Sequence, residues 1–171
     1  LKGQSIGLIT TIQHVHKIND VSKIIESSNK KCIIHKGDTR IAYPGQVLGC
    51  NFSSADIDEC DEYLYIGSGE FHPIGVSLAT GKPVMVADPF TDKTYYVDSS
   101  KILRQRSAVI AKSLDSSVFG IVVSTKVGQC RMELAKSLKE LAKKHGKKAY
   151  ILVMDLVTSE QLLQFKVDAF V

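Results

Sequence analysis

The chain has 171 residues, of which 44% are hydrophobic, and a formal net charge of +4 at pH 7. This length is enough for one or two small domains with a buried core, and the charge is too small to indicate nucleic-acid binding by itself. No apolar run reaches the roughly 18 residues of a membrane span, and the first residues do not resemble a secretory signal. The four cysteines show no secreted disulfide framework, which favours a cytoplasmic protein.

Apolar runs and turn residues predict strands that alternate with helices along the whole chain. In chain order, the predicted strands are 5–10, 31–35, 62–66, 84–87, 94–97, 118–124, 149–154 and the start of one at 167–171. The predicted helices are one that Asn19 or Asp20 caps, a short acidic one from Ser53 or Ser54 to Glu59, 72–80, a long one that Ser99 and Ser100 open, 129–144 and 159–165. This alternation predicts an α/β fold with parallel sheets and right-handed crossovers.

A shift in composition near residues 98–100 divides the chain into two parts. We expect two Rossmann-like parallel-sheet units with flanking helices, at residues 1–98 and 99–171. The chain starts at Leu1 and ends inside a predicted strand, so we expect a piece of a longer protein whose second unit is incomplete.

Several segments with chemically useful side chains follow predicted strands. Ligands of open parallel sheets collect beyond the carboxyl ends of the strands, and residues 10–14, 67–72, 125–131 and Asp155 fall there. The Gly128-Gln129 turn can present backbone N–H groups to an anion, although an ordinary strand-to-helix turn has the same appearance. This pattern indicates one rim where a ligand site is to be sought.

The four cysteines differ in the role that their surroundings favour. Cys32 lies in an apolar predicted strand and Cys60 ends an acidic segment, so both are interpreted as packed thiols. Cys130 begins a predicted helix, where a thiol is more reactive, but an incidental position is the simpler interpretation. Cys50 lies between two glycine-rich turns, where it can pack, form a disulfide, hold a metal or act as a nucleophile. The spacing offers no Cys-x-x-Cys pair for structural zinc.

A set of collinear motifs resembles the archaeal diphthamide synthase family. The matching segments are Gln13-His14, Gly45-Gln46-Val47-Leu48-Gly49-Cys50, Gly67-Ser68-Gly69-Glu70-Phe71-His72, Asp88-Pro89, Arg106 and Ser124-Thr125-Lys126-Val127-Gly128-Gln129. The resemblance extends over essentially all 171 residues. Its most specific parts are the Leu-Gly-Cys and Gly-x-Gly-x-Phe-His motifs.

The resemblance implies a 2-(3-amino-3-carboxypropyl)histidine synthase with three similar α/β domains, assembled as a homodimer. In such an enzyme three cysteines, one per domain, hold a 4Fe-4S cluster. The cluster cleaves S-adenosylmethionine to a 3-amino-3-carboxypropyl radical, which is transferred to a histidine of elongation factor 2 in the first step of diphthamide biosynthesis. Cys50 then matches the cluster ligand of the middle domain, 1–98, and 99–171 is part of the third domain, truncated before its own cysteine.

The resemblance also implies cofactor-binding residues. We assign this role to Gln13, His72, Gly128 and Gln129, and we assign no catalytic residue. With one of three ligands, the chain alone is expected to be colourless and inactive and to bind neither the cluster nor S-adenosylmethionine properly. The reductant is unassigned, and neither a nucleic acid nor a membrane is expected as a partner.

Two other classes of protein remain as alternatives at this point. One is a non-catalytic scaffold or an electron-transfer paralogue. The other is a nucleotide or sugar-phosphate enzyme on a similar sheet, for which the Gly128 turn is the only phosphate-loop candidate.

Overall fold

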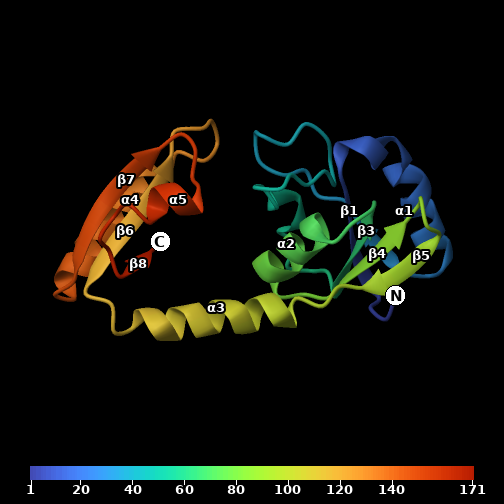
Figure 1. Cartoon of the computed structure of the whole chain (residues 1–171). Helices are drawn as coiled ribbons and strands as arrows, with labels where there is room; N and C mark the ends of the chain where they lie inside the picture. Colours follow the sequence, from blue (N-terminus) through green and yellow to red (C-terminus); the bar gives the residue numbers. More distant parts are fainter. The chain divides into compact units, whose positions relative to one another are not determined.

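The computed structural model describes all residues, 1–171, as two compact units, Leu1–Lys101 and Ile102–Val171 (Figure 1). The division falls inside helix α3 (Ser100–Ser113), slightly after the composition shift in the sequence. Both units are α/β, as predicted, with mostly parallel strands and helices against the sheets. None of the helices combines the length and the apolar character that a membrane crossing requires.

The first unit contains a five-stranded sheet with the order β2-β1-β3-β4-β5. The strands are β1 (Ser5–Thr10), β2 (Lys31–Ile33), β3 (Glu62–Ile66), β4 (Val84–Asp88) and β5 (Lys93–Tyr96). The first four are parallel, but β5 is antiparallel to β4, with Met85 opposite Tyr96. The expectation of parallel strands throughout is therefore wrong for β5. The connection from Asp88 to Lys93 is too short for a parallel crossover, which needs about a dozen residues.

The helices of the first unit differ from the prediction mainly at their starts. They are the 3-10 helices η1 (Ile12–Lys17) and η2 (Ser53–Ala55) and the α-helices α1 (Ile18–Ser27) and α2 (Phe71–Thr80). Because α1 continues from η1, Asn19 and Asp20 lie in its first turn and do not cap it. The acidic segment after Ala55 is not helical, since η2 is a single turn. Helix α2 ends as predicted at Gly81, whose φ of 70° suits glycine.

The core of the first unit lies on both faces of the sheet. On one face, Ile18 and Ile25 of α1 pack with Ile6, Leu8 and Leu64. On the other face, the fully buried side chains of β3 and β4 pack with Val76 of α2; they are Tyr63, Tyr65, Val84 and Val86. Burial on both faces explains why the central strands are nearly continuous apolar runs.

The second unit is a smaller parallel sheet with the order β7-β6-β8. Its strands are β6 (Val118–Ser124), β7 (Lys148–Met154) and β8 (Ala169–Phe170), and its other helices are α4 (Met132–Lys144) and α5 (Ser159–Leu162). Ile121 and Val123 of β6 pack against Ala135 of α4 to form the core. Helix α4 begins three residues later than predicted, because Gln129 belongs to a turn, in which its N–H donates to the carbonyl of Lys126.

Candidate metal-ligand site on the first unit

The loop that carries Cys50 is attached to the carboxyl end of β1. The N–H of Thr10 donates to the carbonyl of Gly45 at 2.8 Å, and the N–H of Val47 donates to the carbonyl of Thr10 at 2.8 Å. The N–H of Gly45 in turn donates to the carbonyl of His35 at 2.8 Å. These bonds fix the base of the loop at the sheet edge where ligands of parallel sheets collect.

Cys50 lies at the tip of this loop, in a tight turn. Leu48 and Asn51 exchange two backbone hydrogen bonds, of 3.0 and 3.1 Å, so that Gly49 and Cys50 form the tip. Cys50 is exposed and free, which places its thiol within reach of a ligand or metal. Packing in the core, one of the four roles left open for Cys50, does not fit an exposed residue.

Gly49 permits a close contact between the turn and helix α2. A Cβ at Gly49 would lie 2.7 Å from Cε1 of Phe71, which is closer than a real Cβ approaches another atom. Phe71 opens α2 and is itself 70% exposed. The structure therefore brings together the Leu-Gly-Cys and Gly-x-Gly-x-Phe-His segments, which are about 20 residues apart in the sequence.

His72 lies behind Phe71, against the sheet. Its ring stacks on Tyr65 with the centroids 6.3 Å apart and contacts the edge of Phe71 at 5.2 Å. Burial lowers the pKa of His72, which favours the neutral imidazole at pH 7. No hydrogen bond joins His72 to Cys50, so the arrangement lacks the contact that a Cys-His nucleophilic pair requires.

Other segments at the same edge are ordered by Asp88, the last residue of β4. One oxygen of Asp88 accepts hydrogen bonds from the Ser68 hydroxyl at 2.6 Å and from the Phe90 N–H at 2.9 Å. These bonds, that of Ser68 above all, hold the pKa of Asp88 below its ordinary value. The ring of His14 contacts Phe90 edge-on at 5.8 Å, and Gln13 beside it is exposed on η1. In the first unit, Gln13 thus lies on the segment after β1, His72 on the segment after β3, and Cys50 on the loop that is bonded to the end of β1.

Gly128 and Gln129 belong to the second unit, and their geometry changes the prediction made for them. Gly128 has a φ of 80°, and the N–H of Gln129 donates to the carbonyl of Lys126 at 3.0 Å. The sequence suggested that the backbone N–H of Gln129 could bind an anion. In the structure this N–H is already used within the turn. The side chain of Gln129 and Arg131 line a pocket of about 180 Å³ beside β6 and α4.

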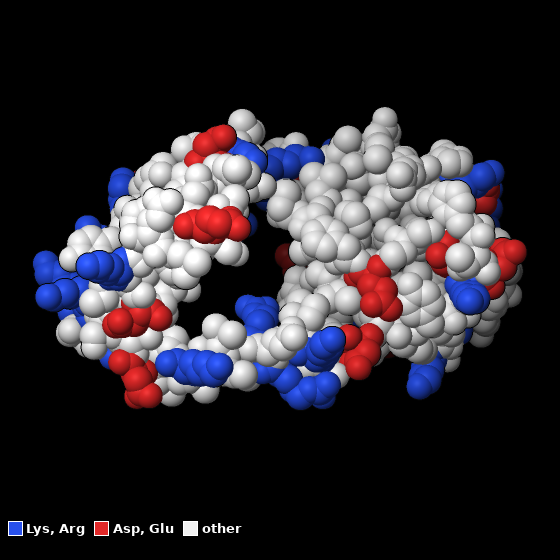
Figure 2. Space-filling view, viewed as in Figure 1, with Lys and Arg blue, Asp and Glu red and all other residues white.

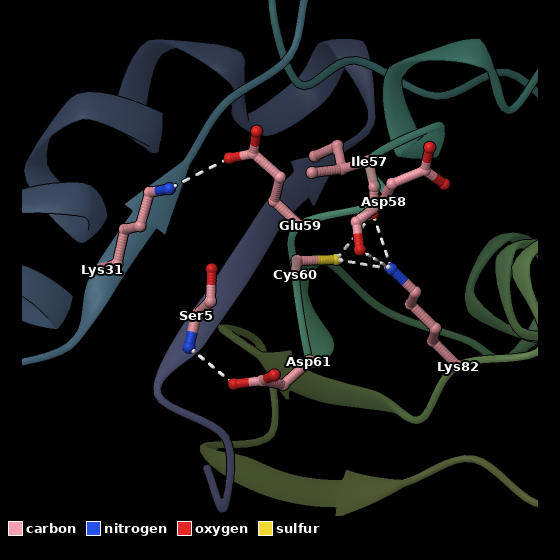
Figure 3. A network of polar contacts seen from close by, with 8 residues as sticks. All are labelled: Ser5, Lys31, Ile57, Asp58, Glu59, Cys60, Asp61 and Lys82. Atoms are coloured by element: carbon pink, nitrogen blue, oxygen red, sulfur yellow. Dashed lines mark hydrogen bonds and ion pairs between the residues drawn. The ribbon is translucent and has the colours of Figure 1, made fainter.

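The other cysteines differ from Cys50 in their surroundings. Cys60 is 4% exposed, and its thiol donates to the carbonyl of Ile57 at 3.4 Å (Figure 3). The ammonium of Lys82 donates to the carbonyls of Ile57 and Asp58 and lies 3.8 Å from the Cys60 sulfur. Cys32 is half-buried, and burial raises the pKa of its thiol. The prediction that Cys32 and Cys60 pack is confirmed, whereas Cys130 is exposed in the loop before α4.

The residues of this chain do not form a complete metal centre. Nowhere do three or more His, Cys, Asp or Glu side chains lie close enough together to hold a metal ion. Cys50 therefore offers one exposed thiol, at the tip of its turn. Two further residues shape this tip although no motif pointed to them. The Asn51 side chain donates a hydrogen bond to Asp38 at 2.8 Å, and no signal in the sequence marks this pair.

Fold and site together define an α/β protein with an exposed cysteine on a loop at the carboxyl edge of a parallel sheet. The family described as "Putative diphthamide synthesis protein" matches residues 1–171, and the chain belongs to it. A 2-(3-amino-3-carboxypropyl)histidine synthase from Pyrococcus horikoshii is 42% identical over 169 residues, which cover 99% of this chain and 49% of that protein. Subunit 1 of the synthase from Saccharomyces cerevisiae is 26% identical over 179 residues, with 99% and 41% covered.

The likeness extends to three dimensions. The crystal structure of Dph2 from Pyrococcus horikoshii with a 4Fe-4S cluster matches 98% of this chain and 50% of that chain, with a TM-score of 0.91 and 42% sequence identity. The resemblance inferred from the motifs is thus confirmed at the level of the family and the fold. The chain spans about half the length of the relatives that it matches.

Proposed function

We propose that this chain is part of a 2-(3-amino-3-carboxypropyl)histidine synthase. The complete enzyme would transfer the 3-amino-3-carboxypropyl group of S-adenosylmethionine to a histidine of elongation factor 2, the first step of diphthamide biosynthesis. The observation that carries the proposal is the exposed, free Cys50 on its tight turn, in a chain 42% identical to a protein whose structure contains a 4Fe-4S cluster. We assign residues 1–98 to the middle domain and 99–171 to part of the third.

In this proposal Cys50 supplies one of three thiolates. Thiolates are the ordinary ligands of iron–sulfur clusters, and the exposure of the turn tip leaves room for one. Because no group of three His, Cys, Asp or Glu side chains in this chain could hold a metal ion, we propose that the other two thiolates come from parts of the enzyme outside it. Cys50 would help to hold the cluster, and the bound cluster would supply one-electron reducing chemistry at a C–S bond of S-adenosylmethionine.

The protein side chains around Cys50 would orient the substrate and limit the access of water. Phe71 covers one side of the turn with an apolar ring, and the neutral His72 offers a ring nitrogen beside it. We propose Gln13 and His72 as contacts for S-adenosylmethionine in the first unit, and Gly128 and the Gln129 side chain in the second. We further propose a homodimer in a reducing cytoplasm, to which four free cysteines are suited.

The alternative of a nucleotide or sugar-phosphate enzyme loses its main support. Its phosphate loop depended on the Gly128 turn, and the amide of Gln129 is committed to the Lys126 carbonyl. The other alternative, a scaffold or electron-transfer paralogue, is distinguished from the synthase by the following experiment.

The test uses the full-length protein, reconstituted anaerobically with iron and sulfide. Wild type, Cys50→Ser and the matched control Cys130→Ser are compared for iron and sulfide content and for transfer of the labelled aminocarboxypropyl group to elongation factor 2. We expect Cys50→Ser to lose both and Cys130→Ser to keep both, while chain 1–171 alone stays colourless. Full cluster content and transfer in Cys50→Ser would refute the proposal, and cluster without transfer in the wild type would favour the electron carrier.

A further inference from the structure

The turn that carries Cys50 has an anchor that lies outside every sequence motif. Asn51 is 4% exposed, although its neighbour Cys50 is exposed. The side-chain Nδ2 of Asn51 donates to Oδ1 of Asp38 at 2.8 Å, and its Oδ1 accepts from the N–H of Ser53 at 3.0 Å. Since the backbone of Asn51 also exchanges two bonds with Leu48, this residue ties the turn to the chain both before and after it.

Asp38 is held in turn by its own neighbours. Its Oδ1 accepts from the N–H of Arg40 at 2.9 Å, and its Oδ2 accepts from the Arg40 guanidinium at 3.0 Å. These bonds, that of the Arg40 N–H first, hold the pKa of Asp38 below its ordinary value. The N–H of Asp38 donates to the Ser53 hydroxyl at 2.9 Å. Asn51 therefore donates to a charged acceptor with a fixed position, which is the stronger kind of hydrogen bond.

The rest of the loop does not depend on Asn51. Three backbone bonds attach its base to Thr10 and His35, and Gln46 Oε1 accepts from the N–H of Tyr43 at 3.1 Å. Loss of the Asn51 side-chain bonds would consequently free the tip and leave the base in place. Such a local anchor suits a metal ligand, because the orientation of a ligating side chain is set by the residues that hold it in place.

We infer that Asn51, held by Asp38, is a positioning residue that fixes the direction of the Cys50 thiol for iron–sulfur ligation. The inference rests on the proposed function and deepens it. Asn51 itself contacts no cofactor in this arrangement, and its effect passes through the peptide bond to Cys50.

The first test measures the order of the turn without any cluster. A nitroxide label is attached to Cys50 of this chain in a Cys32→Ala, Cys130→Ser background. Asn51→Asp removes the donor to Asp38, and the double variant Asn51→Asp, Asp38→Asn restores an amide–carboxylate pair. We expect sharper electron paramagnetic resonance lines, and hence a more mobile label, in Asn51→Asp, with recovery in the double variant.

Controls separate this local effect from a loss of folding. Asp58→Asn, which changes an exposed carboxylate of the same unit, should leave the spectrum unchanged. Circular dichroism melting should be nearly the same for all variants, and if Asn51→Asp does not fold, Asp38→Ala, which removes the acceptor, carries the comparison. A label in the folded variant as immobile as in the parent would overturn the inference.

The second test concerns the full-length protein after reconstitution. We expect iron to be lost to a chelator about 10- to 100-fold faster in Asn51→Asp than in wild type, with recovery in the double variant. Equal retention would overturn the positioning role and leave the proposed function intact. If instead the wild type takes up no cluster, the proposed function fails, while the label experiment still decides whether Asn51 orders the turn.

Discussion

Substitution of Gly45 by alanine should destabilise the first unit and release the loop that carries Cys50. Gly45 has a φ of 73°, and a Cβ at this position would lie 2.2 Å from Cδ1 of Ile18 and 3.0 Å from the carbonyl of Leu8. The left-handed backbone costs about 1–2 kcal/mol for alanine. Overpacking against a buried helix residue adds about 1–3 kcal/mol, so we expect a total loss of roughly 2–5 kcal/mol.

The assay compares this variant with a matched glycine. Gly81 has a φ of 70°, but a Cβ there would meet nothing within 4 Å. Gly81→Ala should therefore carry the backbone cost alone, about 1–2 kcal/mol. Both free energies of unfolding come from urea titrations of the chain followed by circular dichroism, with comparison of midpoints at a common slope. If Gly45→Ala is destabilised no more than Gly81→Ala, the close approach of Ile18 does not constrain the loop and the reasoning is wrong.

Three further predictions concern single side chains. Burial lowers the pKa of His72, so the wild type should lose stability as the pH falls from the ordinary pKa of 6.5 to the lower pKa of the folded state. In urea titrations between pH 4 and pH 8, His72→Gln should lack this part of the pH dependence. Lys82→Met removes the ammonium that bridges the carbonyls of Ile57 and Asp58, and should lower the free energy of unfolding by about 1–3 kcal/mol in the same assay. Ellman's reagent should modify Cys50 and Cys130 at once, and Cys60 only when the chain unfolds; equal rates would contradict the observed burial.

The sequence predicted best those elements that are buried on both faces. The bounds of β1, β3 and β6 coincide with the predicted strands, because a buried parallel strand is a short apolar run that its flanking polar residues delimit. The end of α2 was also predicted correctly, since Gly81 adopts the left-handed conformation that stops a helix. Local chemistry alone decides such features.

Features that depend on the path of the chain were missed or misjudged. The antiparallel direction of β5 follows from a connection too short for a crossover, which becomes decisive only once the strands are known to be neighbours. The predicted caps of α1 were wrong, because η1 leads directly into that helix and Lys17 precedes its first residue. The acidic segment was predicted as a short helix, but only the single turn Ser53–Ala55 forms, because so short a helix makes too few hydrogen bonds to offset the cost of nucleation.

The candidate site shows the same limit. Cys50 and His72 were found through motifs, that is, through short runs with a recognisable order. The contact between Gly49 and Phe71 and the bond between Asn51 and Asp38 join residues that are 22 and 13 positions apart, and nothing in either local sequence indicates them. The distribution of charge does not mark the site either. In Figure 2 the Lys, Arg, Asp and Glu side chains are scattered over the visible face.

A comparison of the two units separates what the fold supplies from what the loop supplies. In each unit the first strand is central, with the second and third strands parallel on either side: β2-β1-β3 in the first unit and β7-β6-β8 in the second. Cys50 lies in the connection between the second and third strands of the first unit. The equivalent connection of the second unit, between Met154 and Ala169, contains no cysteine. The shared topology provides an edge at which a ligand can be held, but the thiol, its glycine and its Asn51 anchor belong to one loop. Chemistry at this edge is therefore a property of that loop, and substitutions at its tip should alter metal binding while the sheet remains intact.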